Sequence, residues 1–173
     1  MKTHPMPRLQ QGASLLIALI FLVMMAMLGV TVANVTNLEE RMAGNTRDRD
    51  LALQAAEAAL RDAERRLAAE AFRTGPPGGG AWPAFDADNA NDAAFWEECF
   101  SKKTGPCAAA LGMEIVLPSG TAAGAVDAQP QFTVETKPDA GTTKVFRVTA
   151  RAVGGSPDTI VVLQAEFGHT PPP

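Results

Sequence analysis

The longest apolar run in the chain extends from Ala13 to Ala33, twenty-one residues without a charge. A helix rises about 1.5 Å per residue, so this run spans roughly 31 Å, which matches the hydrocarbon core of a bilayer. The pattern therefore predicts a transmembrane helix close to the N-terminus.

A charged pattern that is still typical of a helix follows this run. From Asn34 to Phe72 there is one glycine, Gly44, and no proline. Apolar residues recur there at three- and four-residue spacing, which indicates one face of an amphipathic helix. The predicted face consists of Leu38, Met42, Leu53, Ala56, Leu60, Ala63 and Leu67. We expect the helix to be weakest at Gly44 and to end near residues 72–74, because the Pro- and Gly-rich stretch 75–80 cannot continue it.

The last third of the chain has the alternation of β-strands. The predicted strands are Gln131 to Lys137, Lys144 to Val153 and Thr159 to Phe167. Short turns between them imply antiparallel neighbours. In the middle strand, one predicted face carries Phe146, Val148, Ala150 and Ala152, and the other carries Arg147, Thr149 and Arg151. We therefore predict a sheet with one face buried under the helix and the other in water.

Two shorter stretches complete the expected architecture. Residues 113–117 are a candidate short strand, and residues 169–173 look like a frayed end. The prediction is an α+β fold in which a long N-terminal helix packs on a small antiparallel sheet. Its parts are a leader at 1–12, an apolar helix half at 13–33, an amphipathic half at 34–74 and a globular head at 75–173.

Both cysteines lie in a region that we expect to be irregular or briefly helical, residues 81–111. Its aromatic side chains, most of them predicted to be core, are Trp82, Phe85, Phe95, Trp96 and Phe100. Cys99 and Cys107 flank a Gly-Pro turn, and in an exported domain such a pair predicts a disulfide. Their spacing is not that of a Cys-x-x-Cys redox motif, so the predicted role is structural.

The leader before the apolar run sets the expected orientation. It carries Lys2 and Arg8 and no acidic residue, so the N-terminus is predicted to stay in the cytoplasm and the head to be exported into the periplasm. A cleaved secretory signal is an alternative, since residues 31–33 offer small side chains, although the apolar run is longer than such signals have. The net charge of −4 offers no basic surface for nucleic acid.

The sequence holds little material for catalysis. Its two histidines, His4 and His169, lie in the leader and the tail, so neither a histidine triad nor an ordinary zinc site is expected. Ser14, Thr31 and Ser101 accompany no recognisable base. We predict no enzyme, no cofactor and no catalytic residue.

An Asp- and Asn-rich segment at residues 86–92 clusters oxygen ligands of the kind that Ca²⁺ prefers. Ala90 stands at the fifth loop position, and neither the glycine nor the terminal Glu of an EF-hand follows. A plain Asx-rich turn is the preferred interpretation, and no metal site is predicted.

The first third of the chain resembles a known family. The stretch QQGASLLIALIFLVMMAMLGV, which starts at Gln10, resembles a class III prepilin signal, and EERMAGNTRDRDLALQAAEAALRDAE, which starts at Glu39, resembles the segment that follows in PilX-type minor pilins of type IV pili. A basic leader ending in Gly, an apolar helix and the Glu-Arg-Met-Ala-Gly-Asn string occur in the family's order. The resemblance covers about residues 11–66, and we find none for the chain after Gly75.

The resemblance implies a processing and assembly route. A prepilin peptidase would cut between Gly12 and Ala13, and the new amino group of Ala13 would be methylated. The subunit would be stored in the inner membrane and then join other minor pilins and the major pilin, with a tip adhesin as a further candidate partner.

One position departs from the family's usual pattern. Most pilins carry Glu at the fifth mature residue, where this chain has Ile17. The tip-located pseudopilin of type II secretion also lacks that carboxylate, so a type II pseudopilin is the nearest alternative. A membrane-anchored periplasmic enzyme or binding module is the alternative from another class.

Overall fold

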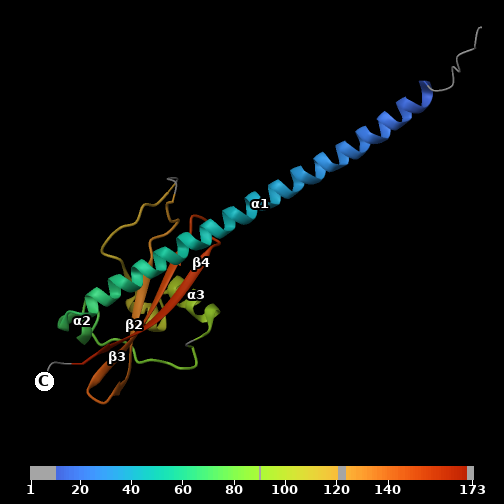
Figure 1. The fold of residues 1–173 in the computed structure, drawn as a ribbon. Coiled ribbons are helices and arrows are strands. Elements are labelled where there is room, and N and C mark those ends of the chain that lie inside the picture. Colours follow the sequence, from blue (N-terminus) through green and yellow to red (C-terminus); the bar gives the residue numbers. More distant parts are fainter. Residues whose placement is uncertain (1–10, 90, 121–123, 171–173) are drawn as a thin grey trace, which may run out of the picture. The chain divides into compact units, whose positions relative to one another are not determined.

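The computed structural model describes residues 11–89, 91–120 and 124–170, with only the backbone for 11–13. The chain divides into two compact units, one up to Asn45 and one from Thr46 onward, which we call the head. The elements, labelled in Figure 1, are helices α1 (Gln11–Leu67), α2 (Glu70–Thr74) and α3 (Ala93–Lys102), a 3₁₀ turn (Gly105–Ala109), and strands β1 (Leu111–Gly112), β2 (Gln131–Ala140), β3 (Thr143–Val153) and β4 (Ile160–His169).

The four strands form one antiparallel sheet in the order β1-β2-β3-β4. The three long strands confirm the predicted ones, and with the long N-terminal helix they confirm the α+β fold. β4 ends at His169, so this residue is part of the sheet and not of a frayed end. The candidate strand at 113–117 is wrong, since β1 precedes it and contains only two residues that pair with β2.

The head portion of α1 covers one face of the sheet, as predicted, but with smaller side chains than the stripe suggested. Its buried residues are Ala52, Ala55, Ala56, Ala59, Asp62, Ala63 and Leu67. They pack on Phe132, Val134, Phe146, Val148, Ala150 and Ala152 of the sheet. Of the predicted stripe, Leu53 is exposed within the head, and Leu38 and Met42 are exposed in the other unit. Alanines therefore make up most of the helix side of this core.

The opposite face of the sheet is not in water, contrary to the prediction. Arg147 and Thr149 of β3 are buried, and α3 and the 3₁₀ turn lie over them through a cluster of Trp96, Cys99, Phe100 and Cys107. Arg151 is tied to Glu97 of α3 at 3.0 Å. Polar alternation therefore marks a second buried face whose charges are paired inside the protein.

The long helix ends seven residues before the expected Thr74. The guanidinium of Arg73 donates hydrogen bonds to the carbonyl oxygens of Leu67 and Ala68, 2.8 and 2.7 Å away, and so satisfies groups that the helix end leaves free. The chain then enters α2. At Gly44 the helix is uninterrupted, and a Cβ there would meet nothing within 4 Å.

Candidate assembly interface

The first half of α1 exposes its large apolar side chains. From Leu15 to Leu38 they are between 43 and 73% exposed within the chain. The helix is long and apolar enough to cross a membrane, and none of its most apolar window is buried in the protein. Such a surface is stable only against lipid or against other apolar helices.

Three polar residues of this half hydrogen-bond to their own helix. Thr31 and Thr36 donate hydroxyl hydrogen bonds to the carbonyls of Met27 and Val32, at 2.9 and 3.1 Å. The Asn37 amide donates to the Ala33 carbonyl at 3.0 Å. These pairings lower the cost of placing hydroxyl and amide groups in an apolar environment.

The predicted processing residues lie at the start of α1. Gly12 and Ala13 follow Gln11, the first helical residue, and only their backbone is described. Ile17 is 54% exposed, one turn further on. From Ser14 to Leu38 the helix carries no Asp, Glu, Lys or Arg, so this chain presents no carboxylate of its own beside the proposed mature N-terminus.

Two carboxylates on the second half of α1, neither of them a predicted site residue, attach the helix to the head. Asp62 is fully buried, its oxygens lie 2.7 and 2.8 Å from the guanidinium groups of Arg65 and Arg66, and it accepts the backbone N–H of Glu114 at 3.3 Å. It therefore pins the chain after β1 to the helix. Asp62 follows Ala59 by three residues and therefore lies on the same face of the helix, the one that packs on the sheet.

Asp48 makes the other attachment, to the turn between β3 and β4. Its carboxylate accepts the backbone N–H groups of Gly155 and Ser156, at 2.5 and 3.2 Å. A Cβ at Gly154 would lie 2.8 Å from the carbonyl oxygen of Asp48, so glycine is required for this approach. No local pattern in the sequence signals this contact, which joins residues more than a hundred positions apart.

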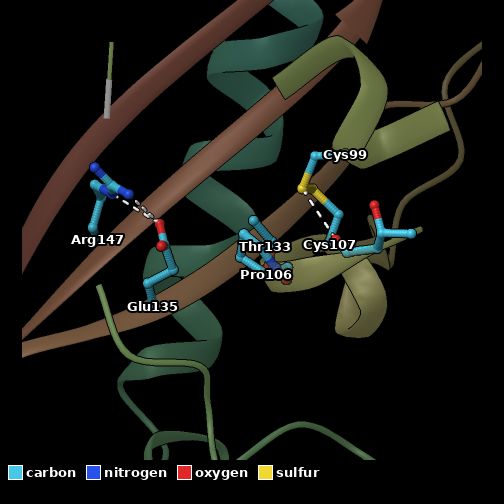
Figure 2. Close-up of a disulfide and its surroundings, with 7 residues drawn as sticks. Cys99, Pro106, Cys107, Thr133, Glu135 and Arg147 are labelled. Atoms are coloured by element: carbon cyan, nitrogen blue, oxygen red, sulfur yellow. Dashed lines mark hydrogen bonds and ion pairs between the residues drawn. A yellow bond between two sulfur atoms is a disulfide. The ribbon is translucent and has the colours of Figure 1, made fainter. Parts of the chain in front are cut away.

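The predicted disulfide is present, with Cys99 and Cys107 joined at a Cα–Cα distance of 5.4 Å. It fixes the end of α3 to the 3₁₀ turn, and the Thr133 hydroxyl of β2 donates to the carbonyl oxygen of Pro106 beside it. Figure 2 shows this staple near the ion pair of Glu135 and Arg147. The disulfide thus belongs to the layer that closes the polar face of the sheet.

The ion pair is the best-buried charged contact in the described head. Nε and Nη2 of Arg147 donate to one oxygen of Glu135 at 2.8 and 2.6 Å, and the two side chains are 3% and 1% exposed. Burial raises the pKa of the Glu135 carboxyl above its usual 4.5, while the hydrogen bond and charge of Arg147 oppose the rise. The Phe85 ring stacks 4.1 Å from the guanidinium, so the pair anchors the loop before α3 to the sheet.

The acidic segment at 86–92 has local backbone roles where the structure describes it. Asp86 accepts hydrogen bonds from the Asp88 N–H and the Asn89 amide, which makes an Asx turn. Asp92 caps the N-terminus of α3 by accepting from Ala94 and Phe95. Within the described ranges no three His, Cys, Asp or Glu side chains form a metal-binding group, and Ala90 lies outside them.

Two family models match the chain, one on each side of the α1–α2 junction. The model described as PilX N-terminal matches residues 11–61, and the model described as type IV pilus assembly protein PilX C-term matches residues 72–169. The chain belongs to the PilX family. The second match corrects the expectation that nothing after Gly75 resembles a known family. No curated protein and no solved structure matches significantly.

This PilX-family chain is a minor pilin that takes part in type IV pilus assembly. Its apolar helix and its family fit a component anchored in the membrane by a single span, and the family indicates a structural role and contacts with other pilus components. Neither match favours a type II pseudopilin. The exposed half of α1 is the surface best suited to those contacts.

Proposed function

We propose that this minor pilin enters the complex that begins the filament and lies at or near the pilus tip. The observation that carries the proposal is Ile17, at the position where most pilins have Glu, on a helix half without any carboxylate. The subunit is then unable to offer the side chain by which an incoming pilin pairs with its predecessor.

Processing is the first step of the proposal. Cleavage between Gly12 and Ala13 removes the leader and leaves the Ala13 amino group, methylated, at the end of an apolar helix. A charged amine buried without a partner among packed helices costs several kcal/mol. A carboxylate must therefore come from another subunit, and a subunit that starts the filament can receive it from the pilin that follows.

The proposed topology places the N-terminus in the cytoplasm and the head in the periplasm. Lys2 and Arg8 before the span support this orientation, as does the Cys99–Cys107 disulfide, which suits an oxidising compartment. The partners are a prepilin peptidase, other minor pilins, the major pilin and, at the tip, an adhesin.

Immunogold labelling of sheared pili tests the position. Label confined to one end of each filament is expected, and label spaced along the shaft would contradict the tip assignment. Ile17→Glu adds the missing carboxylate and is expected to spread the label along the shaft, whereas the uncharged control Ile17→Gln should leave the label at the end. If neighbouring helices make the carboxylate dispensable, all three proteins will label the shaft alike.

A further inference from the structure

Helix α3 and the 3₁₀ turn together form a cap, residues 93–109, over the polar face of the sheet. The turn lies against β2, where the Thr133 hydroxyl donates to the Pro106 carbonyl (Figure 2). The backbone of α3 contacts this turn more extensively than it contacts any strand. The ion pair between Glu97 of α3 and Arg151 of β3 is partly exposed, and such pairs add little stability. The cap is therefore attached to the sheet mainly through its turn and its buried side chains.

The disulfide fixes α3 to that turn. Apart from it, the connection consists of Lys103 and Thr104, and Lys103 has a positive φ of 52°, a backbone conformation that costs a lysine more than a glycine. Cys99 and Cys107 are 2% and 0% exposed and belong to the same buried cluster as Trp96. The covalent link therefore holds a sharp corner closed and, with it, the position of the Trp96 ring.

Trp96 connects the disulfide to the buried ion pair. Its ring lies 5.5 Å from the guanidinium of Arg147, and Arg147 pairs with Glu135 on the neighbouring strand. Removing one member of a buried pair leaves the other charge uncompensated. The cap that covers Arg147 and the carboxylate that neutralises it thus support the same closed arrangement.

Closing the cap leaves two polar atoms unsatisfied. Nε1 of Trp96, in the cap, and Oγ1 of Thr149, on the strand face beneath it, are buried and have no hydrogen-bond partner among the described residues. A buried polar group without a partner is unfavourable. Water would satisfy both atoms if the cap opened, so the closed state needs a constraint, which the disulfide supplies.

We propose that the cap is a redox-controlled closure: with Cys99 and Cys107 as thiols it opens locally and admits water to the Glu135–Arg147 pair, and with the disulfide formed it stays shut. Closing it removes two electrons and two protons from the thiols, and a disulfide-bearing oxidant accepts them and leaves as a dithiol. Both sulfurs are buried once the cap is shut, so a reductant reaches them only when the cap opens. The disulfide and the ion pair stabilise one closed state, and a change in either is therefore felt at the other.

The closure gives oxidation a structural consequence. In the proposed topology the head is exported with free thiols, and its polar face is complete only after the disulfide forms. The closure itself depends on neither the topology nor the tip assignment, because it involves only residues of the head. Its failure would leave both of those proposals intact.

Reduction kinetics of the full chain in detergent micelles test the closure. Dithiothreitol gives two electrons and two protons to the disulfide and becomes a cyclic disulfide, and maleimide-polyethylene glycol marks each thiol produced. Glu135→Ala leaves Arg147 buried without its carboxylate, so the cap opens more often and reduction should be at least about fivefold faster than in the wild type. Glu166→Ala breaks only a partly exposed pair with Lys137 on the same face and should leave the rate within about twofold.

Ala59→Leu separates local opening from unfolding of the whole head. Ala59 packs on the opposite face of the sheet, so the larger side chain weakens the head without touching the cap, and the rate should again stay within about twofold. The closure is overturned if reduction of Glu135→Ala is less than about fivefold faster than that of the wild type, or if Ala59→Leu accelerates reduction as much as Glu135→Ala does.

The two tryptophans provide a second measurement for the case in which Glu135→Ala does not fold. In a Trp82→Phe background Trp96 alone reports on the cap, and in a Trp96→Phe background Trp82 reports on the face that α1 covers. With both cysteines replaced by serine, acrylamide quenching is expected to rise at least about threefold for Trp96 and to stay nearly unchanged for Trp82. A smaller rise for Trp96, or an equal rise for both tryptophans, overturns the closure.

Discussion

Between Leu15 and Leu38, α1 exposes Leu, Ile, Met, Val and Phe side chains, whereas between Ala52 and Leu67 it buries mostly alanine. The apolar half is exposed within the described part of the chain, and such a surface is stable only against lipid or other apolar helices. The head half packs on the sheet mainly through alanines, together with Leu67. The half of α1 with the more hydrophobic sequence is therefore the half that is less buried in the folded chain.

The largest expected effect concerns processing in the apolar half. Under the proposed processing, Gly12→Val is expected to leave the precursor uncut, because cleavage after position 12 would require a small side chain there. Mass spectrometry of the membrane fraction measures the outcome, with Gln11→Ala as a control that should still be cut. A mature chain starting at Asn34 would revive the secretory-signal alternative.

Loss of the buried carboxylate in the head half is expected to be the largest effect on stability. Asp62→Ala leaves Arg66, whose side chain is 15% exposed, without its 2.8 Å partner, and removing one member of a buried pair costs about 3 to 5 kcal/mol. Urea unfolding followed by fluorescence measures the change. The matched control is Glu57→Ala, whose pair with Arg61 is exposed, and an equal loss there would contradict the importance of Asp62.

These outcomes separate what the sequence could and could not predict. A helix long and apolar enough to span a membrane, the three long strands and the disulfide follow from local patterns, and each is present. The buried state of Arg147 was missed, because a strand of alternating polarity looks the same whether its polar face meets water or a paired carboxylate on the next strand. Leu53 was predicted to lie on the buried face because leucine is more hydrophobic than alanine. The structure instead buries Ala52, Ala55 and Ala59 and leaves Leu53 exposed.

The same limit applies to the candidate site. The position of Ile17 is readable from the leader and the span, since both are local. The attachment of Asp48 to Gly155 depends on where the β3–β4 turn comes to lie, which no spacing reveals. The cavity lined by Asn91, Ala93, Trp96, Val162 and Gln164 combines residues from a loop, a helix and a strand, so it exists only in the folded head.

Opening the disulfide tests the layer over the polar face of the sheet. Cys99→Ser is expected to lower the free energy of unfolding by roughly 2 to 3 kcal/mol, because the closed loop restricts the unfolded chain. Thermal melting and limited proteolysis of the head measure the loss. The control is Ser101→Ala, an exposed change on the same helix, which should leave the melting temperature and the protease sensitivity unchanged. Two freely alkylated thiols in protein isolated from the periplasm would refute the disulfide.

The same substitution in both halves of α1 sharpens the comparison directly. Ala59→Leu forces a larger side chain against the sheet and is expected to cost about 1 to 3 kcal/mol, since Ala59 is fully buried. Ala26→Leu adds the same atoms where the side chain is exposed and should leave the melting temperature of the head unchanged. Equal effects at both sites would mean that the two halves are not packed differently.

The smallest expected effect is a pH dependence of the head, whereas residues 14–38 hold no Asp, Glu, Lys, Arg or His. Burial raises the pKa of Glu135 in the folded protein above 4.5, its usual value in an unfolded chain. Between pH 4.5 and the raised pKa, the folded protein therefore binds more protons than the unfolded one. The contribution of Glu135 to stability is then complete below pH 4.5 and is lost as the pH rises through the raised pKa. Other carboxylates titrate too, so the informative quantity is the free energy of unfolding of the wild type minus that of Glu135→Gln. This difference should fall from pH 4.5 upward, and a difference that grows with pH would show that Arg147 outweighs burial and lowers the pKa.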